Sequence, residues 1–200
     1  MFALVESGSI TKYLSGNQGI TLNDLQYPRA IYTLWTEAER NAIGIYSIVY
    51  DNTNKKDERW YINTNQSYTF ANSKVTATYG SATAKAHADT TWTAQDEEDG
   101  LGTEGEVASR GLKYNLIRDV KLEAANELAK TDWYITRKTE KSTAIPSAIT
   151  THRNLVRSRQ AAMETSITNA SDTPALETLY TYTTDSDGVQ SRPLAEIPTL

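Results

Sequence analysis

The chain has 200 residues, a net charge of −5 at pH 7 and no cysteine. The absence of cysteine excludes disulfides, Cys-ligated zinc and thiol catalysis, and two histidines are too few for a histidine-rich metal site. Hydrophobic residues make up 38% of the chain with its 12 tyrosines included, below the roughly 45–50% usual in globular domains, so we expect a small core or one completed by a partner chain. The acidic balance disfavours generic nucleic-acid binding, and no stretch approaches the length of a membrane span.

The first residues predict a β hairpin. Residues 2–6 and residues 9–13 are rich in β-forming side chains, and Ser7-Gly8 separates them. A two-residue turn that contains glycine, placed between two such segments, is typical of antiparallel strands.

A short helix is predicted after Thr36. Thr36 and Glu39 have the spacing of a capping box, in which each side chain accepts a hydrogen bond from the backbone amide of the other residue. Gly44 can close this helix in the left-handed conformation, which limits it to about two turns.

Four further segments predict the rest of a β domain. Residues 45–50 and 59–63 are expected to form one hairpin, and residues 66–70 and 74–79 alternate polar and apolar side chains and predict another. We therefore expect residues 1–79 to form a small, mostly antiparallel β domain.

Residues 80–105 predict an extended arm followed by an acidic linker that contains glycine. Alanine at every second position from 82 to 88 indicates an extended segment with one alanine face, although alanine and lysine also favour helix. Trp92 is expected to be a packed anchor. The boundary between domains is predicted at 94–105.

Residues 106–184 predict a helical hairpin plus a short third helix, and residues 185–200 an extended tail. Two apolar stripes at helical spacing mark the hairpin: Leu112, Leu116, Val120, Ala124 and Leu128, then Ile149, Val156, Met163 and Ile167. Thr173 as cap and Pro174 as first helical residue predict the third helix. The predicted class is α+β: a small N-terminal antiparallel β domain followed by a C-terminal helical hairpin with a third short helix.

A polar and aromatic motif, Thr131-Asp132-Trp133, lies between the two long helices. The indole of Trp133 is predicted to fill the open end of the hairpin, while Thr131 or Asp132 caps the following turn. Arg153 and Arg157 on the second helix favour a solvated face, with a binding patch as the alternative.

These motifs carry a resemblance. The helical part resembles the small helical module near the C-terminus of many tailed-phage tail and tail-fibre-associated proteins. The matching residues are Arg118, Leu128, Thr131, Asp132, Trp133, Pro146 and residues 152–157, with His152 where the module usually has tyrosine. Residues 2–5, 27–29 and 35–44 resemble uncharacterised virion structural proteins of marine and freshwater phages. The resemblance implies a place on or near a phage tail and implies no reaction.

Motifs for catalysis or cation binding are incomplete. The acidic residues 96–99 fail the EF-hand pattern, because Leu101 and Val107 occupy its glycine and glutamate positions. The glycines at 100, 102 and 105 match the spacing of a dinucleotide loop, but the preceding acids would repel a pyrophosphate. We assign no catalytic, cofactor-binding or metal-binding residue and expect a protein that is not an enzyme and uses no cofactor.

Charge is unevenly distributed along the C-terminal half. Residues 110–160 carry eleven Lys or Arg and five Asp or Glu, a balance of +6, and residues 161–200 carry six acids and one arginine, a balance of −5. This asymmetry fits two solvated helix faces with an acidic tail. It also fits a tail that docks on a basic face of this chain or of a neighbour.

The leading hypothesis is a non-enzymatic structural protein of the phage tail: a baseplate, tail-fibre attachment or fibre component. It would be made in the host cytoplasm, lie in the virion and contact other tail proteins as a homo-oligomer or part of a symmetric assembly, with neither nucleic acid binding nor membrane insertion. The first alternative is a tail-fibre assembly chaperone. The second is a host-surface module on which exposed tyrosines and tryptophans, with Trp60 and Trp92 among them, stack on glycans.

Overall fold

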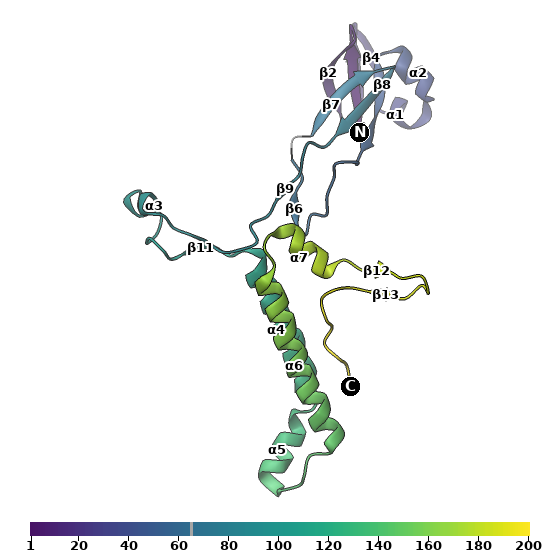
Figure 1. Ribbon diagram of the computed structural model, residues 1–200. Helices are drawn as coiled ribbons and strands as arrows, with labels where there is room; N and C mark the ends of the chain where they lie inside the picture. The colour runs from purple at the N-terminus through teal and green to yellow at the C-terminus, as the bar shows by residue number, and fades with distance from the viewer. Residues whose placement is uncertain (65) are drawn as a thin grey trace. The chain divides into compact units, whose positions relative to one another are not determined.

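A computed structural model describes residues 1–64 and 66–200 and is α+β, with strands concentrated in the N-terminal part and longer helices in the C-terminal part (Figure 1). The predicted class is confirmed at this level. The chain divides into two compact units, Met1–Thr83 and Ala84–Leu200, which are described separately below.

The N-terminal unit contains a five-stranded sheet in the order β2-β1-β5-β8-β7. Its strands are β1 (Phe2–Glu6), β2 (Ser9–Leu14), β5 (Ile45–Asp51), β7 (Ser67–Ala71) and β8 (Lys74–Thr78). The two terminal strands, β2 and β7, come into contact, and the ring centroids of Tyr13 and Tyr68 lie 4.7 Å apart. The sheet therefore curls into a half-barrel.

Two predicted hairpins are confirmed. β1 and β2 are antiparallel around a turn in which Ser7 and Gly8 both have positive φ. β7 and β8 are antiparallel around Asn72 and Ser73, which also have positive φ. Turns with two positive φ angles match the right-handed twist of the strands that they connect.

The hairpin predicted between residues 45–50 and 59–63 is wrong, and the sheet is not wholly antiparallel. β5 pairs with β1 on one side and with β8, in parallel, on the other. Because a strand has only two edges, neither remains for residues 59–63. These residues instead contribute β6 (Tyr61–Ile62), which pairs with β9 (Thr83–Ala84), the strand inside which the two units divide.

One face of the half-barrel packs on short elements. β3 (Ile20–Leu22) and β4 (Leu25–Tyr27) form a hairpin, and α1 (Ile31–Leu34) and α2 (Glu37–Ala42) follow. Ile20 and Ile31 join a buried cluster with Leu4 and Ile45 of the sheet. The predicted capping box is present on α2, and the helix is followed by Gly44 with a φ of 81°.

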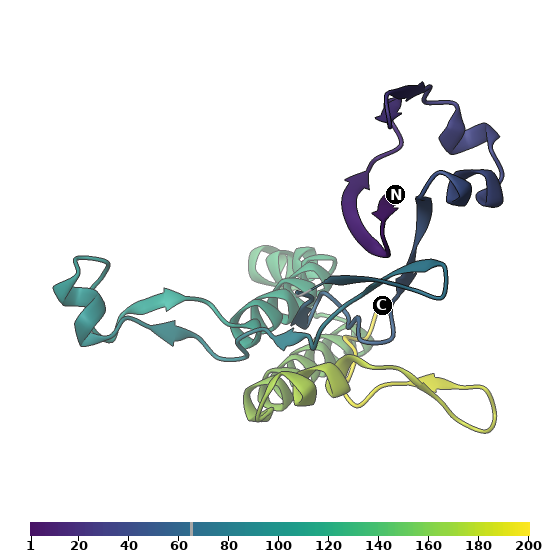
Figure 2. The same cartoon turned by 90° about the horizontal axis from the view of Figure 1, so that it is seen from above.

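Two long helices organise the C-terminal unit. α4 (Leu112–Ala129) and α6 (Ser147–Asn169) lie side by side in both views (Figures 1 and 2). Both predicted stripes contribute buried side chains: Leu116, Val120 and Ala124 from α4, then Ile149, Val156, Met163 and Ile167 from α6. Between the two long helices lies a further helix, α5 (Asp132–Lys141), which the sequence analysis did not predict.

The short helix α7 (Thr173–Tyr180) begins one residue earlier than the predicted cap implies. Asp172 is its N-cap, and Oδ1 of Asp172 accepts a hydrogen bond of 2.8 Å from the amide of Ala175. Thr173 is instead buried, and its hydroxyl donates to the carbonyl oxygen of Lys85 at 2.6 Å. The carboxylate therefore takes the capping role that we assigned to the hydroxyl.

The predicted acidic linker is wrong, because that segment is the helical tip of an arm. β10 (Thr90–Thr91) and β11 (Val107–Ser109) form an antiparallel ribbon that carries α3 (Ala94–Glu98) at its end (Figure 2). Thr93 and Asp96 form a second capping box, which starts this helix.

The C-terminal tail contains a short strand and two buried apolar residues. β12 (Thr183–Thr184) and β13 (Gln190–Ser191) form a short antiparallel pair. Beyond them Leu194 and Ile197 are buried, and the Leu194 amide donates to the Leu179 carbonyl oxygen at 2.9 Å. This hydrogen bond connects the tail to α7.

Candidate interaction sites

The first candidate site is a buried cluster centred on Arg153 of α6. Arg153 is 7% exposed, and its Nη1 donates to the Leu128 carbonyl oxygen at 2.8 Å and to Oγ1 of Thr131 at 2.6 Å. Its Nη2 lies 2.8 Å from Oδ1 of Asp132. The structure therefore brings together three of the residues that the sequence singled out. The prediction that Arg153 belongs to a solvated face is wrong, because its side chain is buried and its guanidinium binds residues at the junction between α4 and α5.

Thr131 is fully buried and occupies the N-cap position of α5. Its hydroxyl donates to the Leu128 carbonyl oxygen at 3.0 Å and accepts from Arg153, so it is not used for the predicted capping bond. Thr131 and Asp132 instead both bind the guanidinium of Arg153, which belongs to α6.

Glu127 extends this cluster and was missed by the sequence reasoning. Its buried carboxylate accepts hydrogen bonds from Nζ of Lys130 at 2.5 Å and from the Leu200 amide at 2.9 Å, and it lies 3.1 Å from Nε2 of His152. The hydrogen bond from Lys130, followed by those from Leu200 and His152, holds the pKa of Glu127 below its usual value.

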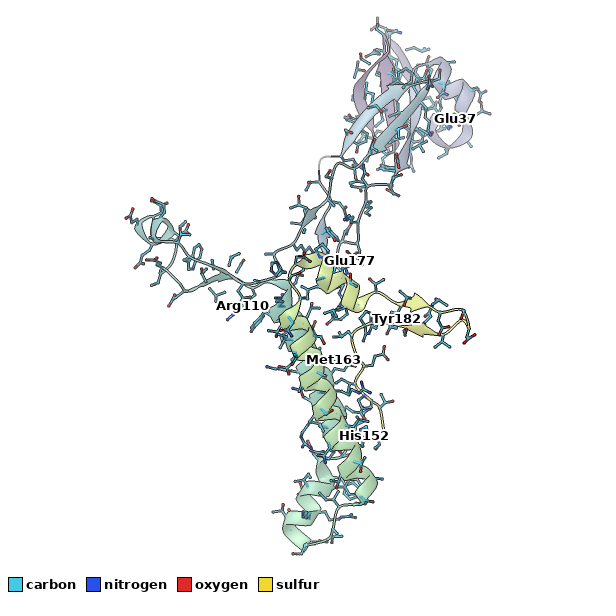
Figure 3. The ribbon with its side chains drawn as sticks, viewed as in Figure 1. Glu37, Arg110, His152, Met163, Glu177 and Tyr182 are labelled. Atoms are coloured by element: carbon cyan, nitrogen blue, oxygen red, sulfur yellow. The ribbon has the colours of Figure 1, made fainter. Side chains whose placement is uncertain are left out.

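The sequence does contain an indication that Glu127 is buried. Glu127 lies seven residues after Val120, which places its carboxylate on the apolar stripe of α4. Its partner His152 lies near the end of α6 that is closest to α5, whereas Met163 lies farther along the same helix (Figure 3). The carboxylate therefore connects the end of α4 to α6 and to the tail.

The second candidate site is the surface of α5. Trp133 is 51% exposed, so the prediction that its indole fills the open end of the helix pair is wrong. Its ring lies 3.7 Å from that of Tyr134, and the Arg137 guanidinium lies over both rings at 4.7 and 5.1 Å. Ile135 is exposed as well, and none of the described residues of α5 is buried.

The third candidate site is the side of α4 that faces away from its buried stripe. Tyr114 and Leu122 are exposed there, and a hollow of about 280 Å³ is lined by Tyr114, Ile117, Arg118 and Lys121. The Arg110 guanidinium lies 4.2 Å from the Tyr114 ring. Apolar side chains with cationic neighbours give this face the composition of an interface.

The remaining predicted site residues do not join these clusters. Arg157 is exposed on α6, as expected for a solvated position. Trp60 is 3% exposed, which removes it as a stacking surface for a glycan. Trp92 is half-buried, and its indole lies against Gly102 so closely that a Cβ added there would come within 2.3 Å of Nε1. Trp92 therefore packs the arm, as expected of an anchor.

Within residues 1–64 and 66–200, no group of three or more His, Cys, Asp or Glu side chains is placed to hold a metal ion. No helix in the described part of the chain is both long and apolar enough to cross a membrane. Neither a protein-family model, nor a curated protein, nor a solved structure matches this chain.

Proposed function

We propose that this chain is a non-enzymatic structural protein of a phage tail: a baseplate, fibre-attachment or fibre component that acts through contacts with other tail proteins. In this proposal α4 and α6 act as a helical hairpin, α7 is its third short helix, and the surfaces of α4 and α5 contact neighbours in the virion.

The observation that carries the proposal is the exposed apolar surface of α5. An isolated helix of this length is marginal in water and usually depends on burying one face. Trp133 and Ile135 are nevertheless exposed, although Tyr134 and Arg137 of the same helix lie against the indole. A tryptophan with an adjacent arginine is the kind of pair that dominates binding energy at protein interfaces.

The outer side of α4 supports the same proposal. In helical bundles, each helix packs its apolar face against its neighbours. α4 packs along α6 and leaves Tyr114 and Leu122 exposed on its other side. Another copy of the chain or a different tail protein would bury these side chains, which agrees with the low apolar fraction of the sequence.

Quantitative mass spectrometry of purified particles from the source phage tests the proposal. We expect this chain in the particles, in a copy number that matches the rotational symmetry of the tail. The expressed chain, measured in parallel by light scattering, is expected to self-associate. Particles that lack the chain would contradict the proposal. A chain that is absent from particles and monomeric or dimeric in solution would support the alternative, a tail-fibre assembly chaperone that binds its client transiently.

A further inference from the structure

The face of the half-barrel opposite α1 and β3 is rich in tyrosine. Tyr50 of β5 and Tyr68 of β7 are each directly opposite Ala77 of β8, one on either side. Directly opposite residues on paired strands share a face, so both tyrosine rings lie on the same side of the sheet as Ala77. Ala77 is completely buried, and Tyr13 of β2 packs on Tyr68. Three strands thus contribute tyrosines to one surface.

These tyrosines gather at one end of the half-barrel. β5 and β8 are parallel, and β7 is antiparallel to β8. The C-terminal ends of β5 and β8 and the N-terminal end of β7 therefore lie at the same end of the sheet. Tyr79 directly follows β8 at this end. The pKa of Tyr68 is raised by burial and by the proximity of Tyr50, Tyr13 and Tyr79, as expected for neighbouring phenol groups. We call Tyr13, Tyr50, Tyr68 and Tyr79 the tyrosine cluster.

The tyrosine cluster is accessible. Tyr13 is 53% exposed and Tyr50 is 44% exposed, while Tyr68 and Tyr79 are half-buried. The Tyr50 hydroxyl lies 3.9 Å from Sδ of Met1, which is itself exposed. The mouths of β-barrels are frequent locations for ligand sites.

Neutral polar groups border the tyrosine cluster. Gln66 accepts a 2.8 Å hydrogen bond from the Tyr68 hydroxyl through Oε1, which leaves its amide nitrogen without a partner among the described residues. Asn54 donates to the Tyr79 carbonyl oxygen at 3.1 Å, which leaves its own carbonyl oxygen as an acceptor. The two amides therefore offer both donors and acceptors to a ligand.

Charge near the tyrosine cluster is compensated. The Lys55 ammonium lies 5.7 Å from the Tyr79 ring, but it pairs with Glu58 at 3.2 Å. Lys12 and Asp51 belong to the adjoining strands at positions that alternate with Tyr13 and Tyr50, so they lie on the opposite face. An anion would need an uncompensated cation, and a cation would need a carboxylate, so an uncharged ligand fits this surface best.

From this arrangement we infer that the tyrosine cluster is a binding site for a neutral oligosaccharide. The faces of a sugar ring are lined by C–H groups, which pack on the aromatic rings of Tyr13 and Tyr50. The hydroxyls at the edge of the sugar both donate and accept hydrogen bonds, and the Gln66 and Asn54 amides supply the matching groups. The inference goes beyond the proposed tail role, because a structural protein needs no ligand site.

A proline-rich peptide is the main competing ligand, since aromatic grooves also bind such segments. Proline has no backbone N–H group, so a proline-rich peptide presents mostly acceptors. It would leave the acceptor of Asn54 unused, whereas a sugar hydroxyl would satisfy it. The Gln66 amide offers a donor and the Asn54 amide offers an acceptor, and a sugar hydroxyl can bind either of them. The pair of amides therefore favours the sugar over the peptide.

Isothermal titration calorimetry on the full chain tests the inference. The probes are neutral oligosaccharides of glucose, mannose, galactose and N-acetylglucosamine, with an oligoproline peptide as the competing ligand. We expect at least one sugar to bind. Tyr13→Ala and Tyr50→Ala should each weaken that binding by about fivefold, because loss of an aromatic contact costs on the order of 1 kcal/mol. Both residues are exposed, so these variants should remain folded by circular dichroism.

Tyr182→Ala is the matched control, since Tyr182 is exposed to a similar degree but belongs to the C-terminal unit. It should bind the sugar as the unmodified chain does. Three results would overturn the inference: no binding of any sugar by the folded chain, equal affinity in the two cluster variants and the control, or binding of oligoproline alone. None of them bears on whether the chain is present in purified particles, so the tail proposal is tested separately.

Discussion

The guanidinium of Arg153 donates a 2.6 Å hydrogen bond to Oγ1 of Thr131, and both side chains are buried where α4 ends and α5 begins. The same guanidinium donates to the Leu128 carbonyl oxygen at the end of α4, which also accepts hydrogen bonds from the amide and the hydroxyl of Thr131. One side chain from α6 thus fixes the position of α5 relative to the two long helices.

Arg153→Ala should destabilise the C-terminal unit by about 2–3 kcal/mol, because a buried hydroxyl and a helix-terminal carbonyl lose a charged donor. Chemical denaturation followed by far-ultraviolet circular dichroism measures the change. Arg157→Ala is the control: Arg157 is exposed on the same helix, so its replacement should change stability by less than about 0.5 kcal/mol. Equal effects in the two variants would show that the buried contacts of Arg153 contribute nothing.

Local signals in the sequence predicted local structure well. The turns at Ser7-Gly8 and Asn72-Ser73 and the capping box of Thr36 and Glu39 are present, because each depends on a few adjacent residues. The parallel pairing of β5 with β8 could not be predicted in this way, since it depends on which distant strands occupy the two edges of β5.

The candidate sites show the same contrast between features set by adjacent residues and features set by long-range packing. The motif at Thr131 and Asp132 was recognised, but its partner Arg153 was assigned to the surface because it is charged. Its position, four residues after Ile149 and three before Val156, nevertheless places it on the buried stripe of α6. The tyrosine cluster was missed, since strand order and register bring Tyr13 and Tyr68 together from opposite ends of the sheet.

The carboxylate of Glu127 should make stability depend on pH in the acid range. Hydrogen bonds from Lys130, Leu200 and His152 lower its pKa in the folded state. A carboxyl group whose pKa is lower when folded adds stability above its unfolded pKa of about 4.3, and this contribution is lost as pH falls through the folded value.

Glu127→Gln removes this titration. We expect the variant to be less stable than the unmodified chain at pH 7 and the difference to shrink as the pH falls below about 4.3. Thermal melts at a series of pH values measure it. Glu123→Gln, at an exposed position of the same helix, is the control and should follow the unmodified chain throughout. A constant difference between Glu127→Gln and the unmodified chain at all pH values would contradict the prediction.

The arm formed by β10, α3 and β11 depends on a close contact between Trp92 and Gly102. A Cβ on residue 102 would come within 2.3 Å of the indole nitrogen, so Gly102→Ala must displace the ring or the backbone. We expect faster proteolytic cleavage within residues 93–106, detected by mass spectrometry, with the helical circular dichroism little changed. Gly100→Asn is the control, because Gly100 has positive φ, open space surrounds it and asparagine tolerates that conformation. Equal cleavage of the two variants would count against the packing role of Trp92.

The exposed side chains of α5 give the most direct test of self-association. Trp133→Ser removes an indole that is 51% exposed and packs on Tyr134 and Arg137 of its own helix, so it should leave folding nearly intact. If α5 contacts another copy, loss of an interface tryptophan costs about 2 kcal/mol, which raises the dissociation constant about 30-fold in sedimentation velocity measurements. Thr136→Ser, at an exposed polar position of α5, should associate as the unmodified chain does. If Trp133→Ser also associates normally, self-association does not use α5, and the exposed side of α4 becomes the surface to alter next.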